Sequence, residues 1–220
     1  MGMRVLVIDH ASTDRTGEIA RERGAEVIER PWEGFVASRR FALTQVRTPW
    51  TLMIDADEEL DARLREAIGA ADEAFNGYLL ARTTFYCGRP LRMWRNERLL
   101  RLFRTKDARI EAAPKAGGSA HLHERNVCEP PIGTLPGMLL HYSYPTHAAY
   151  AAKYAWYTSI ESTGLPASGG KAAAEILRVV PRFAWYMVGK SALADGPAGI
   201  RIAWLSALYP ALVRIKALRR

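Results

Sequence analysis

The sequence predicts an α/β fold in which helices flank a mostly parallel sheet, followed by a helical C-terminal region. Three observations lead to this prediction. Short apolar segments alternate with helical ones at the start of the chain, acidic side chains directly follow two of the apolar segments, and alanine and aromatic residues dominate from about residue 146. With 220 residues, the chain has room for one full domain and an appendage.

The first predicted strand is RVLVID at residues 4–9, a run rich in β-branched side chains that ends in turn and cap residues. A helix is expected at 16–23, a second strand at 25–28 and a second helix at 35–46, where apolar residues recur at helical spacing. WTLMI at 50–54 is the third strand. This alternation indicates a parallel unit with right-handed crossovers.

Later elements are predicted with weaker periodicity. A helix is expected near 61–71, and further strands at 78–81, 99–103 and 139–142. Helices are expected at about 146–162 and 172–188, after the change in composition. We therefore expect two regions, 1–145 and 146–220.

Carboxylates follow two of the predicted strands. Asp9 and Asp14, with Ser12 between them, come after the first strand, and Asp55 and Asp57 come after the third. Because ligands of parallel α/β sheets bind beyond the carboxyl ends of the strands, we expect these groups to share one site. Paired carboxylates suit Mg²⁺ or Mn²⁺, which are commonly shared with a substrate diphosphate. The alternative is that the acidic run at 55–59 only caps the next helix.

Five segments together resemble one protein family. DHASTDRT at residues 9–16 resembles the D-x-x-S-x-D-x-T segment of inverting family 2 glycosyltransferases of GT-A (Rossmann-like) fold, and LMIDADE at 52–58 resembles their metal-binding D-x-D strand end. RLLRLFR at 98–104, HE at 123–124 and HYSY at 141–144 are similar to the subgroup that includes the lipopolysaccharide core β-glucosyltransferases. In this family a strand and a helix normally precede the Asp9 segment, so the expected sheet lacks the family's first strand.

The resemblance implies a role for each matching residue. Asp9 is expected to contact the nucleotide base, Asp55 to lie near the ribose or sugar, and Asp57 to hold the divalent cation. Glu124, with His123, takes the place of the catalytic base, which removes the proton of the acceptor hydroxyl as that hydroxyl attacks the anomeric carbon. The whole expected donor-binding set is Asp9, Ser12, Asp14, Arg39, Asp55 and Arg101.

Several alternatives remain open from the sequence alone. In a regular strand Arg101 faces the opposite side from Arg98 and Arg104, so the three arginines are not expected to point into one site. His123 and Glu124 also fit an ordinary surface pair. His141 fits a core histidine, or one that supports a ligand from behind, better than a metal ligand.

The expected function is transfer of a sugar from a nucleotide diphosphate donor to a lipid-linked saccharide, in lipopolysaccharide or cell-envelope glycan biosynthesis, with inversion and with Mg²⁺ or Mn²⁺. The absent first strand favours an alternative, a truncated and inactive family member that only binds nucleotide or membrane. The open sheet edge is compatible with a homo-oligomer. Nucleic acid is not an expected partner, because no recognition helix or RNA-stacking motif accompanies the basic charge.

Basic charge is concentrated in the last fifty residues, which carry nine Lys and Arg against two acidic residues, within a net charge of +8. The apolar segment 202–213 is shorter than the roughly 20 residues of a membrane span, and it suits the membrane interface, with Trp204 and Tyr209 at headgroup depth. Pro210 keeps open the alternative of a helix packed on the domain. The two cysteines predict no disulfide framework. We expect a peripheral protein on the cytoplasmic face of the inner membrane, attached to an anionic lipid surface.

Overall fold

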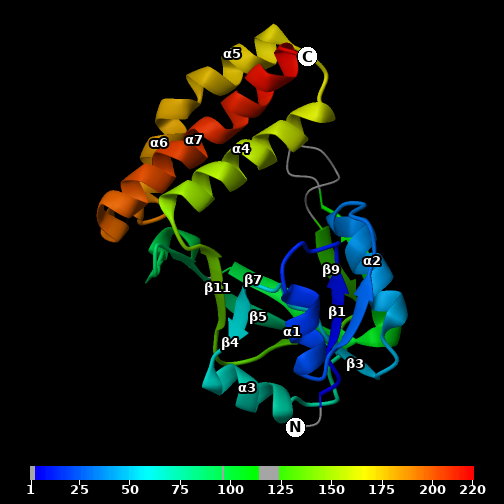
Figure 1. Cartoon of the computed structure of the whole chain (residues 1–220). Helices are drawn as coiled ribbons and strands as arrows, with labels where there is room; N and C mark the ends of the chain where they lie inside the picture. The colour runs from blue at the N-terminus through cyan, green and yellow to red at the C-terminus, as the bar shows by residue number, and fades with distance from the viewer. Residues whose placement is uncertain (1–2, 96, 114–123) are drawn as a thin grey trace.

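The structure is a computed structural model and describes residues 3–95, 97–113 and 124–220. A layer of four helices lies beside the part of the chain that contains the sheets (Figure 1). The predicted α/β class is confirmed, since helices flank a central sheet and a long apolar helix ends the chain.

The first four elements follow the predicted alternation: β1 Leu6–Asp9, α1 Thr16–Glu22, β2 Glu26–Glu29 and α2 Phe35–Gln45. β1 and β2 are parallel, with Leu6 opposite Glu26. Within the described residues, no ladder joins this pair to the larger sheet.

The larger sheet has seven strands. Its order is β3-β7-β5-β11-β4, and β6 and β10 also pair with β5. The strands are β3 Trp50–Leu52, β4 Glu58–Leu60, β5 Gly77–Tyr86, β6 Arg89–Pro90, β7 Glu97–Arg104, β10 Ile132–Thr134 and β11 Leu139–Tyr144. A separate antiparallel pair is formed by β8 Ala108–Ala112 and β9 Glu124–Cys128.

The sheet is mixed, whereas the sequence predicted mostly parallel pairing. β5 runs parallel to β10 and β11, while β3–β7, β5–β7, β5–β6 and β4–β11 are antiparallel. After α3 (Ala62–Gly69) the chain returns through short connections, such as the Cys87–Gly88 turn, in which both residues have positive φ. Short connections join antiparallel neighbours, and parallel neighbours need a crossover.

The core of this part lies between the sheet and α3. Leu64 of α3 is fully buried against Leu80 and Leu139 of the sheet. Gly137 has φ +99, and a Cβ at this position would lie 2.3 Å from the backbone N of Leu64. Only glycine therefore allows the chain to pass this close to α3 on its way into β11.

Four helices follow β11: α4 His147–Thr163, α5 Gly169–Leu177, α6 Val179–Val188 and α7 Gly196–Leu218, with the short 3₁₀ helix η3 at Ala192–Asp195. Thr146 caps α4 by accepting a hydrogen bond from Ala149 N, and Ser168 caps α5 in the same way. α7 is central to the layer, because it packs against α4, α5, α6 and η3. α4 lies on the side of the layer nearest the sheets (Figure 1).

Small side chains let α7 pack closely. Gly199, Ala203, Ala207 and Ala211 are buried along it. A Cβ on Gly199 would lie only 2.0 Å from the carbonyl O of Ala192. In the described part of the chain, Ala192–Leu218 is the one helical segment whose length and composition would suffice to cross a membrane.

Candidate active site

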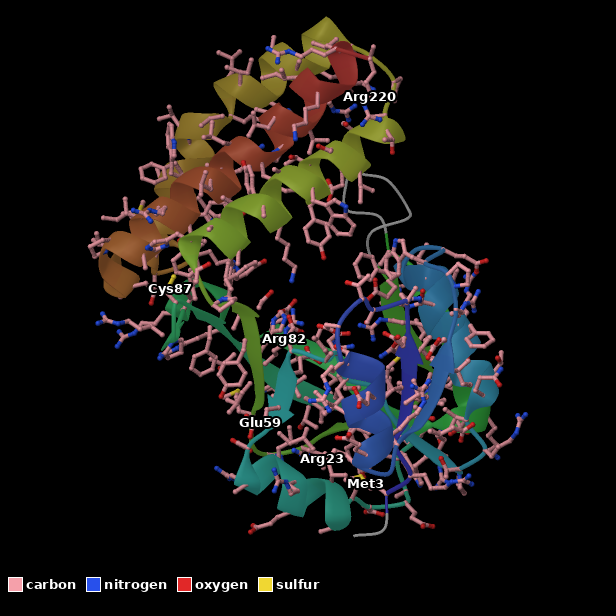
Figure 2. The ribbon with its side chains drawn as sticks, in the orientation of Figure 1. Met3, Arg23, Glu59, Arg82, Cys87 and Arg220 are labelled. Carbon is pink, nitrogen blue, oxygen red and sulfur yellow. The ribbon has the colours of Figure 1, made fainter. Side chains whose placement is uncertain are left out.

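The site lies between the sheets and the helical layer. A cavity of about 1110 Å³ opens there, lined on one side by Asp55, Asp57, Arg101 and Glu124 and on the other by Tyr154, Tyr157, Arg182 and Tyr209. Figure 2 shows Arg82 among polar side chains on the side of the sheet that faces α4. The cavity is wide enough for a substrate of several rings.

Asp9 ends β1 and is nearly buried. Its carboxylate accepts hydrogen bonds from the hydroxyl of Ser12 and, at 3.3 Å, from Ser12 N. These bonds fix the loop after the strand, where Gly17 at the start of α1 also approaches the Asp9 carboxylate. Asp9 and Ser12 are thus held together at the end of β1, but neither lines the cavity that holds Asp55 and Asp57.

Asp14 is fully exposed and its carboxylate accepts a hydrogen bond of 3.0 Å from Thr16 N. Hydrogen bonds from Thr16 lower the pKa of Asp14. This contact stabilises the first turn of α1. Asp14 does not line the cavity that holds Asp55 and Asp57.

Asp55 lies beyond the end of β3, beside two arginines. Its carboxylate contacts Arg39 of α2 and, at 2.9 Å, Arg101 of β7. Burial acts to raise the pKa of Asp55, but the charges of Arg101 and Arg39 outweigh it and the pKa is lowered. Asp55 is therefore an ionised group held in place by ion pairs.

Arg101 lies at a β-bulge of β7. Tyr78 of β5 faces Leu102 of β7, and the next residue, Leu79, faces Leu100, so Arg101 is the extra residue of β7. A bulge locally breaks the alternation of side chains, and Arg98 and Arg101 both line the cavity. Arg101 is buried, and its guanidinium also lies 3.0 Å from Glu58.

Glu58 supports the site from beneath. Its side chain is fully buried, and it pairs with Arg101 and with Arg82, both at 3.0 Å. Its second oxygen accepts a hydrogen bond of 2.9 Å from Asp55 N. A buried carboxylate needs such partners, because an unpaired one would carry a large desolvation cost. Glu58 thus fixes the backbone that presents Asp55 and Asp57.

Asp57 faces the cavity beside two basic side chains. His141 Nε2 lies 3.3 Å and Lys153 Nζ 3.9 Å from Asp57 Oδ2. Burial acts to raise the pKa of Asp57, and the hydrogen bond and charge of His141 outweigh it, so the pKa is lowered. The other ring nitrogen of His141 lies 3.2 Å from Thr84 Oγ1, which holds the ring in position. His141 therefore orients Asp57.

Glu124 begins β9 and is mostly buried. One carboxylate oxygen lies 2.8 Å from Arg39 Nε, and the same guanidinium contacts Asp55. Arg39 thereby brings the expected donor site and the expected catalytic base to one place. His123, expected beside Glu124, lies outside the described residues.

Aromatic side chains of the helical layer form the opposite wall of the cavity. Burial raises the pKa of Tyr154 and of Tyr157 to about 12, so both phenols are neutral and can act as hydrogen-bond donors. Tyr209, expected at headgroup depth, instead packs edge-on against Tyr154 with ring centroids 5.4 Å apart. The prediction for Tyr209 is wrong, because its face of α7 turns toward α4.

The structure brings together the expected residues Arg39, Asp55, Asp57, Arg101 and Glu124, while Arg104 points away. The guanidinium of Arg104 stacks on Trp50 and donates to Glu73 O at 2.6 Å. Sequence reasoning missed Glu58 and Lys153 and left His141 undecided. The only sign of Glu58 in the sequence was that an acidic residue directly follows the D-x-D pair.

No three His, Cys, Asp or Glu side chains are arranged to hold a metal ion within the described ranges. A cation shared with a substrate needs fewer protein ligands, since one or two carboxylates and the diphosphate complete its shell. Asp57 is ionised, partly exposed and faces the cavity. The residues present therefore fit a substrate-shared cation and do not form an all-protein metal cage.

Carboxylates and guanidiniums gathered beyond a strand end place this chain in the class of α/β proteins whose ligand site lies at the carboxyl ends of the strands. The family model described as Glycosyl transferase family 2 matches residues 2–123. This match covers more than half of the chain, and the chain belongs to glycosyl transferase family 2.

Individual relatives agree with this family. An uncharacterized glycosyltransferase of Rickettsia prowazekii, RP128, is 38% identical over 99 residues, which are 45% of this chain and 33% of the relative. The lipopolysaccharide core biosynthesis glycosyltransferase LpsC of Rhizobium meliloti is 33% identical over 150 residues, covering 63% of this chain and 53% of LpsC. The chain thus spans between one third and about half of these relatives.

A structure of S. aureus TarS, residues 1–349, is similar over 98% of this chain and 79% of that one. The sequence identity is 17% and the TM-score is 0.41.

Proposed function

We propose that the protein transfers a sugar from a nucleotide diphosphate donor to a lipid-linked saccharide, with inversion at the anomeric carbon. The observation that supports this most is that Asp55, Asp57 and Glu124 line one cavity. Such a transfer needs groups for the diphosphate and a base for the acceptor within reach of the same sugar.

The sugar and diphosphate of the donor would bind on the sheet side of the cavity, with Asp55 near the ribose or sugar. Asp9, with Ser12, lies at the end of β1 outside the lining of this cavity and is proposed to take the nucleoside. Asp57 would hold Mg²⁺ or Mn²⁺, which when bound neutralises the departing diphosphate. Arg39 and Lys153 add positive charge near the same position and favour an anionic ligand.

Glu124 is proposed as the catalytic base. The acceptor oxygen forms a bond to the anomeric carbon while the bond from that carbon to the diphosphate breaks, and the acceptor proton passes to Glu124. One oxygen of Glu124 is engaged by Arg39 at 2.8 Å, which holds the carboxylate in position. The second oxygen is the one that would accept the proton.

The acceptor would bind on the helical side. The aromatic rings of Tyr154, Trp156 and Tyr157 line the cavity there and offer apolar faces with polar rims, which suit sugar rings. The name of LpsC refers to lipopolysaccharide core biosynthesis. We therefore propose a lipopolysaccharide or other cell-envelope glycan precursor as the acceptor class.

A lipid-linked acceptor places the protein at a membrane. We propose peripheral attachment of the helical layer to the cytoplasmic face of the inner membrane. From Lys171 onward the chain carries nine basic and two acidic residues, and this excess of positive charge supports attraction to anionic lipid.

A second candidate is a family member that binds nucleotide without turning it over. It is favoured by the contacts of Arg39, which engages both Asp55 and Glu124. If these ion pairs hold when the donor is bound, Arg39 competes with the acceptor hydroxyl for Glu124.

Release of nucleoside diphosphate distinguishes the two candidates. The protein is incubated with UDP- and GDP-linked hexoses and Mn²⁺, with water or detergent-solubilised lipid-linked saccharide as acceptor. We expect release from one donor, dependent on the cation and lost in Glu124→Gln, while Glu124→Gln still binds the nucleoside diphosphate. Nucleotide binding by the wild type without release from any donor would favour the second candidate.

A further inference from the structure

The helical layer has an exposed apolar stripe on the face opposite the cavity wall. On α5 and α6 the exposed side chains recur at helical spacing: Ala173, Ile176, Leu177, Val180, Ala184, Trp185 and Val188. Leu177 is 79% exposed, Val180 69% and Val188 80%. Single apolar residues scattered over a protein surface are ordinary, whereas a contiguous apolar surface marks an interaction site.

The stripe continues past the end of α6. Leu193 of η3 is 63% exposed, and Trp204 of α7 is exposed next to Phe183, with ring centroids 5.5 Å apart. α5 and α6 lie on the side of α7 that is remote from the sheets (Figure 1). Other side chains of these helices, such as Arg182, line the cavity that holds Asp55 and Asp57, but no residue of the stripe does.

The charges around this stripe are almost all positive. Lys190 lies over the ring of Trp185 at 5.2 Å, and Arg178 is exposed beside Leu177. The two acidic residues of this region are already paired. Glu175 contacts Arg178 and Arg182, and Asp195 accepts hydrogen bonds of 2.8 and 3.0 Å from the backbone N of Arg92 and Met93.

Arginines gather at the η3 end of the stripe. A second cavity, of about 700 Å³, is lined there by Arg89, Arg92, Arg95 and Arg201 together with Ala194 and Pro197. All four arginines are exposed. Figure 2 shows Cys87, in the turn before Arg89, next to this end of the helical layer. Four guanidiniums beside an apolar surface suit phosphate groups at the edge of a hydrocarbon layer.

We propose that the outer face of α5, α6 and η3 is the surface by which the protein lies on an anionic bilayer. The apolar stripe enters the boundary between headgroups and acyl chains, Trp185 and Trp204 lie at headgroup depth, and the arginines at η3 contact lipid phosphates. This inference rests on the proposed membrane location and assigns it to a surface. It moves the contact from segment 202–213 to α5 and α6.

The packing of α7 favours lying on the bilayer over crossing it. Lys216 Nζ donates to Thr158 Oγ1 of α4 at 2.7 Å, and Arg182 donates to Ala207 O at 2.8 Å. Ile202, Ala203 and Ala207 are fully buried within the layer. A spanning α7 would lose these contacts and place Lys216 near or inside hydrocarbon.

The test is co-sedimentation of the full chain with phosphatidylglycerol–phosphatidylcholine vesicles and with phosphatidylcholine vesicles. We expect the wild type to prefer the anionic vesicles and the Leu177→Glu, Val188→Glu double variant to bind about tenfold more weakly or worse. The matched control, Ile19→Glu with Ile132→Glu, adds the same charge at exposed apolar positions outside the layer and is expected to bind like the wild type. Arg89→Ala with Arg92→Ala is expected to weaken binding by about fivefold or more.

Each contrary outcome has its own meaning. Equal vesicle binding by the wild type and the stripe variant overturns the surface assignment, provided that both melt at the same temperature. A wild type that binds no vesicles overturns the membrane location, and nucleoside diphosphate binding measured without vesicles shows whether the transferase proposal survives. A wild-type dimer that the stripe variant converts to monomer in lipid-free solution assigns the face to a second copy. Bound protein that resists alkaline carbonate extraction overturns peripheral attachment.

Discussion

Arg39 Nε lies 2.8 Å from a carboxylate oxygen of Glu124, which ties the middle of α2 to the start of β9. The same guanidinium contacts Asp55, and its side chain is only 12% exposed. Arg39 therefore reduces the repulsion that two neighbouring carboxylates would exert on a diphosphate. It also fixes the candidate base relative to the D-x-D strand end.

Arg39→Ala is expected to weaken nucleoside diphosphate binding by about tenfold or more, because it leaves Asp55 and Glu124 without their shared cation. Arg40→Ala is the matched control on the next residue of the same helix. Arg40 Nε donates to Ile110 O at 2.9 Å, away from the cavity. Calorimetric titration should show nucleotide affinity unchanged in Arg40→Ala. Equal losses in the two variants would contradict a specific role for Arg39.

Arg101→Leu is expected to lower the free energy of unfolding by about 3–5 kcal/mol, because it removes one of the two cationic partners of the buried Glu58. Arg104→Leu, on the same strand, removes a stacking contact with Trp50 and one hydrogen bond, and should cost about 1 kcal/mol. Urea unfolding measures both. A loss below about 1 kcal/mol in Arg101→Leu would show that the buried network contributes little.

Gly199→Ala should destabilise the helical layer by about 1–3 kcal/mol, since the new Cβ would meet the Ala192 carbonyl at 2.0 Å and force η3 away from α7. Gly170→Ala is the control. Nothing lies within 4 Å of a Cβ there, and alanine favours helix α5, so stability should rise by about 0.5–1 kcal/mol. Thermal melting of both variants tests whether η3 and α7 pack as described.

Acid should lower the free energy of unfolding only at low pH. Burial acts to raise the pKa of Asp55 and Asp57, but Arg101, Arg39 and His141 outweigh it, so both values lie below the ordinary range. A lowered folded-state pKa contributes stability above the unfolded value of about 3.9, and this contribution is lost as pH falls through the folded value. Unfolding free energy should therefore hold from pH 7 to about pH 5 and fall below about pH 4. Over the same pH range the Asp57→Asn variant should lose less unfolding free energy than the wild type. Identical pH profiles of the two proteins would contradict the lowered pKa of Asp57.

The sequence predicted the strand ends well. β1 and β3 deliver Asp9 and Asp55 close to the expected positions, because apolar β-branched runs followed by cap residues constrain the local backbone strongly. Predicted strand pairing was less accurate. The antiparallel course of β7 depends on contacts with β3 and β5 that are distant in sequence, and no local pattern encodes them.

Site residues that belong to a family motif were predicted, and residues that only the three-dimensional arrangement brings to the site were missed. Glu58 belongs to the site because its buried carboxylate pairs with Arg82 and Arg101, and both partners are distant from it in sequence. Lys153 reaches Asp57 from α4, far along the chain, and no spacing rule relates the two. Tyr209 was assigned to the membrane because local hydropathy does not show which face of α7 turns toward α4.

The most direct test of the central claim is isothermal titration of the full chain with UDP and GDP, with and without Mn²⁺, together with Asp57→Ala. We predict that one nucleotide binds in a manganese-dependent way, and that Asp57→Ala removes this dependence while its melting temperature stays close to that of the wild type. A folded wild type that binds neither nucleotide, or an Asp57→Ala variant that binds as tightly as the wild type with Mn²⁺, would contradict the assignment of this strand end as a cation-dependent donor site.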